Sequence, residues 1–133
     1  MDIPGRVGGR APRIYVPRLR LASRVYRNVD RGPAWWSRTG RPSGGDTIAI
    51  AGHRTTHSRP FYYLERLRPG DRVFVSWQGR TQEYEVAGNR VLSARNMHIA
   101  DARGHEVLIL SACTPRGSAS HRLVVYAYPK EER

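Results

Sequence analysis

The sequence predicts a mainly β fold, a closed or partly closed antiparallel-rich barrel of roughly seven or eight short strands. The 13 glycines and 9 prolines are spread along the chain, which is typical of a turn-rich globular protein. The apolar residues come in short alternating or β-branched runs separated by turn residues, a pattern that favours strands. Only one segment has helical spacing, so one or two short helices are expected.

The first strands are expected where regular patterning begins, near Arg13. Residues 1–12 are rich in Gly, Pro and Arg and are predicted to be a flexible lead-in, which leaves residues 13–133 as a single domain. The stretch RIYVPRLRLASRVYR alternates apolar residues with arginines and predicts two short strands, with Pro17 at a break or an edge. After a long turn-rich loop, Asp46–Gly52 predicts a strand that ends at His53.

The second half of the chain predicts one or two helical turns, a hairpin and two central strands. Apolar residues spaced by three, from Phe61 to Leu67 ahead of a Pro-Gly stop, favour the helical turns. The segment RVFVSWQGRTQEYEV predicts a hairpin that turns at Gln78-Gly79. EVLILSAC and RLVVYAY are almost continuously apolar, which is typical of strands covered on both faces.

The composition restricts the classes of partner and compartment. The formal net charge is +12, and Lys130 is the only lysine among 23 basic residues. Such a charge favours polyanions or anionic surfaces as partners. Cys113 is the only cysteine, which excludes an intramolecular disulfide. No stretch has the length and hydrophobicity of a membrane span or of a signal peptide, so a membrane anchor is expected to be absent from this chain.

Three side chains are predicted to converge at one rim of the sheet. His53 follows the strand TIAIA, Cys113 ends the strand EVLILSAC, and Arg122 begins the strand RLVVYAY. If these strands are neighbours, a thiol, an imidazole and a guanidinium meet, which is a suitable set for nucleophilic catalysis. Alternation in the last strand puts Leu123 in the core and Arg122 on the other face. The alternative is that Cys113 is a small buried hydrophobic residue.

Two separated segments of the chain resemble the sortases, the cysteine transpeptidases of bacterial envelopes. These are AIAGHRTTHSRPFYYLERLRPGDRV and LILSACTPRGSASHRLVVYA, and RIYVPRL is similar to the family's opening strand. Within the family the segments look most like class E, with class D as its neighbour. The resemblance implies an eight-stranded sortase-type β-barrel over residues 13–133, with His53, Cys113 and Arg122 as catalytic residues. Where the family pattern ends in Thr-Cys, this sequence has Ala112-Cys113.

The resemblance also implies an activity and its partners. The enzyme is expected to cleave the Thr-Gly bond of an LPXTG- or LAXTG-like sorting signal on secreted proteins, through a thioacyl intermediate, without a cofactor. The acyl group would pass to an amine of a peptidoglycan cross-bridge or a pilin. A monomer at the extracellular face of the cell membrane, in contact with the anionic wall, is expected. Asn89–Asp101 resembles the family's connection ahead of the cysteine strand, where signal preference is expected to be set.

Two other interpretations of the sequence remain open. His53 and His57 are four residues apart, a spacing found in zinc sites, although the segment follows a strand and lacks the accompanying glutamate. We therefore expect no metal. Trp35-Trp36 and the arginine-rich first third could belong to a small basic β-barrel that binds single-stranded nucleic acid or another polyanion without catalysis. Paired tryptophans that cap one end of a barrel are the simpler explanation, and nucleic acid is not expected as a partner.

Overall fold

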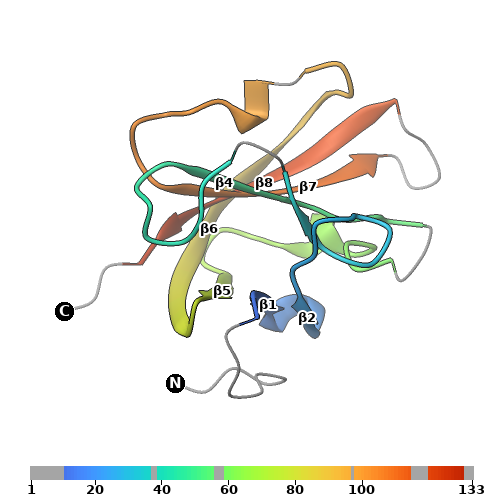
Figure 1. The fold of residues 1–133 in the computed structure, drawn as a ribbon. Coiled ribbons are helices and arrows are strands. Elements are labelled where there is room, and N and C mark those ends of the chain that lie inside the picture. Colours follow the sequence, from blue (N-terminus) through green and yellow to red (C-terminus); the bar gives the residue numbers. More distant parts are fainter. Residues whose placement is uncertain (1–10, 37–38, 56–58, 97, 115–119, 131–133) are drawn as a thin grey trace.

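A single curled sheet dominates the computed structural model, which describes residues 11–36, 39–55, 59–96, 98–114 and 120–130 (Figure 1). The strands of the described part are β1 (Arg13–Val16), β2 (Leu21–Arg24), β3 (Ala34–Trp35), β4 (Thr47–Ala51), β5 (Arg72–Trp77), β6 (Arg80–Ser93), β7 (Val107–Thr114) and β8 (His121–Pro129). Three 3₁₀ helices join them, η1 (Pro17–Leu19), η2 (Leu64–Arg66) and η3 (His98–Ala100). Among the described residues, no helix has the length and hydrophobicity needed to cross a membrane.

The strand order brings distant parts of the chain together. It runs β2-β1-β5-β6-β8-β7-β4-β3, and every neighbouring pair is antiparallel except β4 and β7, which are parallel. Tyr26, just beyond β2, forms an isolated bridge to Ala34 in β3, so the two edges of the sheet approach one another. The predicted mainly β, eight-stranded fold is confirmed.

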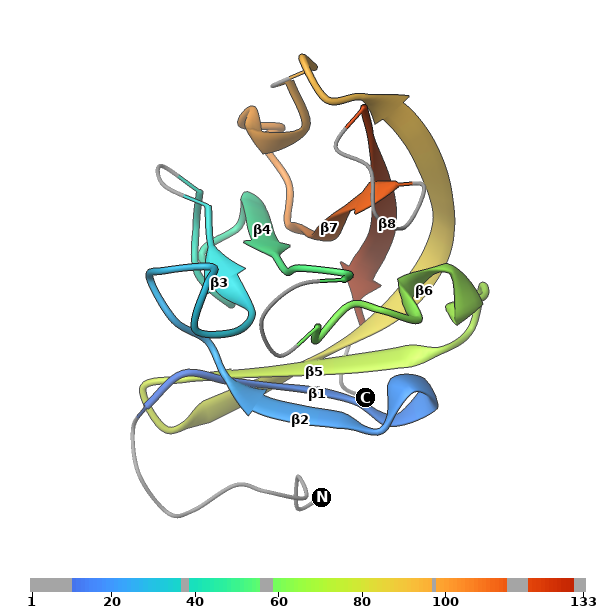
Figure 2. The ribbon, with the colours of Figure 1, turned by 90° about the vertical axis from the view of Figure 1, so that its right-hand side faces the viewer.

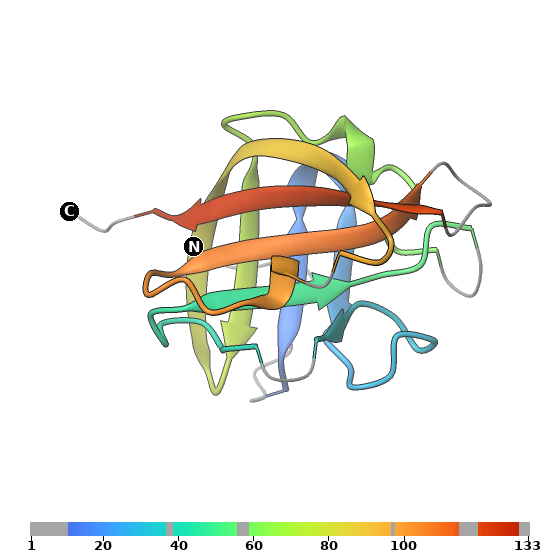
Figure 3. The same ribbon diagram turned by 90° about the horizontal axis from the view of Figure 1, so that it is seen from above.

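Strand β6 makes the sheet curl. Its first residues pair with β5, and from Tyr84 onwards it pairs with β8, with a bulge between Val86 and Gly88. A bulge bends a strand and increases its twist. Figure 2 shows β6 rising in an arc from the wall formed by β1, β2 and β5 to the wall that contains β7 and β8. Seen from above, the strands of the two walls cross steeply (Figure 3).

Two local expectations are changed by the structure. The one or two helical turns expected from Phe61 to Leu67 are present in the tighter 3₁₀ form, as η2 and the i→i+3 hydrogen bonds on either side of it. The connection expected over Asn89–Asp101 begins later, because its first residues continue β6 to Ser93. The hairpin turn is as predicted, with Gln78 and Gly79 at positive φ of 53° and 79°, as a two-residue type I′ turn requires.

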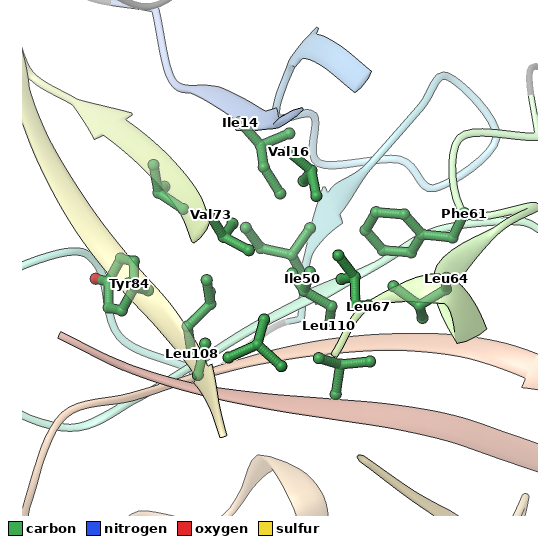
Figure 4. Close-up of a cluster of buried hydrophobic side chains, with 14 of the residues drawn as sticks. Ile14, Val16, Ile50, Phe61, Leu64, Leu67, Val73, Tyr84, Leu108 and Leu110 are labelled. Atoms are coloured by element: carbon green, nitrogen blue, oxygen red, sulfur yellow. The ribbon is translucent and has the colours of Figure 1, made fainter. Parts of the chain in front are cut away.

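The main hydrophobic core fills the space between the two walls. Figure 4 shows Ile14 and Val16 of β1 facing Ile50 of β4 and Leu108 and Leu110 of β7, while η2 contributes Leu64. All of these side chains are almost completely buried. Since alternate residues of a strand point to opposite faces, the residues between them must point out of this core.

A second cluster covers the outer face of β4, β7 and β8. It contains Ala49, Val107, Ile109 and Val124, with Ile99 of η3 over them. Trp36, Leu92 and Tyr126 pack against it. The prediction that β7 and β8 are covered on both faces is therefore correct. This second face is where the candidate site lies.

Candidate active site

Strand alternation places Cys113 and Arg122 on the outer face of the sheet. In β7, Leu110 and Ala112 belong to the main core and Ile109 to the second cluster, so Cys113 lies on the side of Ile109. The same alternation in β8 separates Leu123 from Arg122. Cys113 and Arg122 are direct partners in the β7–β8 ladder. Cross-strand partners on one face have Cβ atoms about 4.5–5.5 Å apart, so thiol and guanidinium are neighbours.

The parallel pairing of β4 and β7 brings His53 to the same level. Ala51 is the partner of Ser111, and the N–H of Gly52 donates to the Ser111 carbonyl at 3.0 Å, so the chain continues alongside β7 after β4 ends. Extending this register by two residues sets His53 opposite Cys113. Strands at this spacing are about 4.8 Å apart.

All three side chains line one pocket of about 580 Å³. This size is typical of small-ligand sites. Its remaining walls come from the loop between β2 and β3, from β3 and its neighbour Trp36, and from the ends of β4 and β7. The lining residues are Arg27, Asn28, Val29, Ala34, Trp35, Trp36, Ala51, Gly52, His53, Ser111, Ala112, Cys113 and Arg122. Cys113 is a free thiol and is partly exposed, in contrast to a core cysteine.

Arg122 is held in place by an aromatic ring and keeps a donor unsatisfied. Its guanidinium carbon lies 5.1 Å from the centre of the Trp36 ring, within the range of a cation–π contact. Its Nε is buried and has no hydrogen-bond partner among the described residues. A buried donor without a partner costs about 1–3 kcal/mol. An oxygen of a bound substrate would remove that cost.

His53 has a carboxylate partner that is not predicted from the sequence. Its Nε2 lies 2.8 Å from Oδ1 of Asp30, in the loop between β2 and β3. Since an ionised carboxylate only accepts, Nε2 carries the proton of this hydrogen bond. The His53 side chain is 28% exposed and that of Asp30 is 55% exposed, so the pair sits at the mouth of the pocket.

Arg54 fastens the segment after β4 to the end of β7. Its side chain is 6% exposed, and it donates from Nη1 to the carbonyl of Cys113 at 3.3 Å and from Nη2 to Oε1 of Glu65 at 2.6 Å. The residue next to the imidazole therefore holds the backbone of the residue that carries the thiol. Glu65 belongs to η2, so the clamp joins three elements around the site.

The two residues before Cys113 in β7, Ser111 and Ala112, point to opposite faces of the sheet. Ala112, which stands where the related pattern has threonine, is 3% exposed and packs in the main core. Ser111 lines the pocket, is fully buried, and its hydroxyl has no hydrogen-bond partner among the described residues. Together with Arg122 Nε, it is a second polar group in the pocket that a ligand could satisfy.

The two open interpretations of the sequence find little support in the described part of the chain. His57 lies outside the described residues, and among those described no group of three or more His, Cys, Asp or Glu could hold a metal ion. The two tryptophans separate: Trp35 packs against the main core and Trp36 against the second cluster. Both are partly buried, and the guanidinium groups of Arg41 and Arg122 lie over their rings, so the two rings do not form one continuous aromatic surface of the kind on which bases stack.

Sequence reasoning missed Asp30, Arg54 and Trp36. Asp30 is one of only two acids in residues 1–42, and that rarity was the one available signal. Arg54 belongs to the segment that resembles the sortases, and nothing in the sequence distinguishes it within that segment. For Trp36 the sequence suggests a capping residue or part of a basic, aromatic binding surface, and not a contact with Arg122.

Comparisons with known proteins agree on one family. Residues 14–130 match the family described as the sortase domain. Sortase SrtE1 of Streptomyces coelicolor is 32% identical over a region that covers 65% of this chain. The chain spans 27% of the length of that curated relative.

Solved structures give the same result for the fold. Sortase C-1 from Actinomyces oris superposes with a TM-score of 0.85 at 26% identity, covering 93% of this chain and 76% of that one. Sortase E1 from Streptomyces coelicolor, solved with a tripeptide in its active site, gives a TM-score of 0.84 at 25% identity and covers 100% and 93% of the two chains. Sortase A from Corynebacterium diphtheriae is similar at 21% identity with a TM-score of 0.83.

Proposed function

The chain belongs to the sortase family, and we propose on that premise that it is a cysteine transpeptidase that sorts secreted proteins. In this proposal, residues 13–133 are one catalytic domain. The substrate is an LPXTG- or LAXTG-like sorting signal, and the scissile bond joins its Thr and Gly. The observation that carries the proposal is the common pocket of Cys113, His53 and Arg122.

In the first half-reaction His53 holds the proton that the Cys113 thiol has released, and the Cys113 thiolate attacks the Thr carbonyl carbon. The oxygen gains negative charge in the tetrahedral intermediate, and Arg122, with its unsatisfied buried Nε, is the donor that stabilises it. The C–N bond then breaks, and His53 gives a proton to the departing amine. The products are a thioacyl enzyme and a free N-terminal glycine.

In the second half-reaction an acceptor amine attacks the thioacyl carbonyl. A new C–N bond forms, the C–S bond breaks, and the proton lost by the amine returns to His53. The acceptor is a peptidoglycan cross-bridge amine or a pilin lysine. We place the enzyme, as a monomer, at the outer face of the cell membrane, where the net charge of +12 attracts it to the anionic wall.

A ligation assay tests the activity. The protein is incubated with peptides that carry LPXTG and LAXTG signals and with triglycine as the acceptor, and the products are identified by mass spectrometry. We expect a ligated product and a thioacyl adduct on Cys113 that disappears when triglycine is added. Absence of product and adduct with every signal and acceptor would refute the proposal.

Cys113→Ala is the matched test of the nucleophile. This substitution leaves a small side chain in β7, so we expect an unchanged fold, retained binding of the signal peptide and complete loss of turnover. Ser93→Ala, at the end of β6 and away from the pocket lining, is the control that should keep full activity. A non-catalytic binding module would show the same behaviour before and after Cys113→Ala, which distinguishes that alternative.

A further inference from the structure

A second hollow in the molecule is lined almost entirely by arginine. It has a volume of about 630 Å³ and lies at η1 and η2, two turns that contact one another (Figure 2, blue and green turns). It shares no residue with the catalytic pocket. Its lining consists of Arg18, Leu19, Arg20, Tyr63, Arg66 and Arg68. No carboxylate is among its described lining residues.

Most of these arginines form no side-chain ion pair among the described residues, although Asp71 also accepts from the backbone N–H of Arg68 at 2.9 Å. Arg18 is paired with Asp71, which accepts from both its Nε and its Nη2 at 3.3 and 3.0 Å. Among the described residues, Arg20, Arg66 and Arg68 form no ion pair through their side chains. Like charges gathered around one hollow repel each other, and an anion placed between them removes that repulsion.

A backbone turn and an aromatic contact hold two arginines of the hollow in place. Arg20 is the C-cap residue of η1, with φ 52°, so its backbone is fixed in the left-handed region. The guanidinium carbon of Arg66 lies 3.9 Å from the centre of the Tyr63 ring. A guanidinium on an aromatic face keeps its N–H groups at its edge, directed to whatever enters beside it. Tyr63 is 41% exposed, and its ring packs edge-on against the Tyr62 ring with 4.8 Å between the ring centres.

A neighbouring hollow extends the basic surface. It shares Leu19, Arg20 and Tyr63 with the first and adds Arg59, whose guanidinium carbon lies 5.5 Å from the centre of the Tyr62 ring. The surface thus combines arginines from both turns with two tyrosines just before η2. The planar guanidinium groups of these arginines match the geometry of phosphate, whose oxygens accept paired N–H groups.

From these observations we infer that the hollow between η1 and η2 is a binding site for phosphate groups, the phosphomonoester or phosphodiester anions of a soluble polymer or of a lipid headgroup. Its size accommodates more than one phosphate group, and Arg20, Arg66 and Arg68 are the principal donors. The site is separate from the sorting reaction and would hold the enzyme against a phosphate-bearing surface while its catalytic pocket works.

The test compares two triple variants with the same loss of charge. The hollow variant is Arg20→Gln, Arg66→Gln and Arg68→Gln, and the control variant is Arg24→Gln, Arg80→Gln and Arg90→Gln. The control arginines are also exposed, line neither arginine-rich hollow and form no side-chain ion pair among the described residues. Circular dichroism confirms the fold of both, and peptide ligation by both should equal that of the wild type.

Tripolyphosphate is the soluble probe, and its affinity is measured by calorimetry at two salt concentrations. We expect the hollow variant to lose at least about tenfold in affinity, the equivalent of roughly 1.4 kcal/mol, while the control variant loses less than about threefold. Equal losses in the two variants would show that only net charge matters and would overturn the inference. Because binding needs no turnover, the result is independent of the ligation assay.

Vesicles distinguish the two sources of phosphate. Sedimentation with phosphatidylglycerol vesicles, compared with phosphatidylcholine vesicles, measures lipid binding, and a soluble glycerol-phosphate polymer measures the other source. If the hollow variant loses more binding than the control variant with either probe, the result supports the site. The probe that shows the difference identifies the source of the phosphate. Binding of oligothymidylate that survives the hollow substitutions while these probes do not bind would point to a nucleic-acid surface elsewhere and would contradict the proposal.

Discussion

Asp30 is the residue whose position gives the sharpest test of the catalytic geometry. It holds His53 Nε2 at 2.8 Å, which fixes both the plane of the ring and the nitrogen that carries the proton. In the proposed reaction Nε2–H stays bonded to Asp30, so the departing amine takes its proton from Nδ1–H of the imidazolium form of His53, which the Asp30 contact orients. Asp30 itself touches no reacting atom in this arrangement, so its role is that of a positioning residue.

We predict that Asp30→Asn lowers kcat by about three- to thirtyfold, a part of the 10²–10⁴ that general acid–base catalysis supplies. The KM for the sorting signal should be unchanged, because the substitution keeps the shape of the side chain. Long-range ¹⁵N NMR of histidine should show a changed chemical shift for Nε2 of His53, which loses its carboxylate acceptor. Asp30→Glu should recover part of the rate.

Asp101→Asn is the control for this prediction. Asp101 also accepts from a histidine, His98, at 2.9 Å, but the pair lies at η3 and both side chains are largely exposed. Its removal should leave kcat unchanged. If Asp30→Asn and Asp101→Asn have the same small effect, and the His53 spectrum does not change, Asp30 does not position the imidazole.

At this scale the sequence was informative wherever a residue belongs to a strand. The alternation of core and outer faces sufficed to predict the direction of Arg122, and strand ends sufficed to place Cys113 and His53 at one rim. Asp30 could not be found in this way, because it lies in a loop whose path depends on contacts with distant strands. Arg54 escaped for a different reason, since burial of an arginine depends on partners that only the fold supplies.

The segment that follows β4 is the element on which the site depends most. Gly52 lies between the strand and His53, and a Cβ at this position would approach Cδ2 of Phe61 to 2.6 Å. Phe61 is fully buried in the main core, so its ring has little freedom to move. The N–H of Phe61 also donates to the His53 carbonyl at 3.1 Å. A shift of Phe61 therefore reaches His53, the general acid of the proposed reaction.

We predict that Gly52→Ala destabilises the protein by about 1–3 kcal/mol, as overpacking of a core does, and also lowers kcat. The free energy of unfolding is measured by urea denaturation and kcat by peptide ligation. Gly88→Ala is the matched control, since a Cβ there meets nothing within 4 Å. Its effect should stay within about 0.5 kcal/mol. Equal stability of the two variants would show that Phe61 yields easily and would contradict this account.

The elements themselves were predicted to different degrees. The hairpin and the two central strands have strong local signals and lie where they were expected. The length of β6 could not be read, because the bulge at Gly88 lets one strand serve two partners and the second pairing is with β8, far along the chain. The segment around η2 has helical spacing in sequence, and i→i+3 hydrogen bonds such as that from the Leu64 N–H to the Phe61 carbonyl at 3.1 Å form it, while both side chains are buried in the core.

At the scale of the whole molecule, the excess of arginine has a structural use as well as an electrostatic one. Arginines lie over the rings of Tyr26, Trp35, Trp36, Tyr62 and Tyr63. Significant cation–π contacts occur roughly once per 70–80 residues, so this chain has more than its length predicts. Lysine cannot stack in the same way, which gives a physical reason for arginine at these positions. The net charge alone does not tell which arginines pack on aromatic rings and which are available to bind an anion.

The charged groups also set the pH range over which the fold is stable. The hydrogen bond from Arg18 lowers the pKa of Asp71, and backbone N–H groups of Arg103 and Thr47 lower the pKa of Asp46. A lowered carboxyl pKa gives stability that is present above the unfolded value, about 4, and is lost as the pH falls. On the alkaline side, burial and the hydrogen bond to Glu106 raise the pKa of Tyr84 far above its usual range.

A raised tyrosine pKa has the opposite sign. The unfolded chain releases its phenolic proton near pH 10 while the folded chain keeps it, so stability falls as the pH rises above about 10. We therefore predict that the urea midpoint is highest from about pH 5 to 9 and declines on both sides. Asp71→Asn should flatten the acid limb alone and Tyr84→Phe the alkaline limb alone. An alkaline limb with the same slope in Tyr84→Phe as in the wild type would show that the buried Tyr84–Glu106 hydrogen bond, which joins β6 to the turn before β7, does not control it.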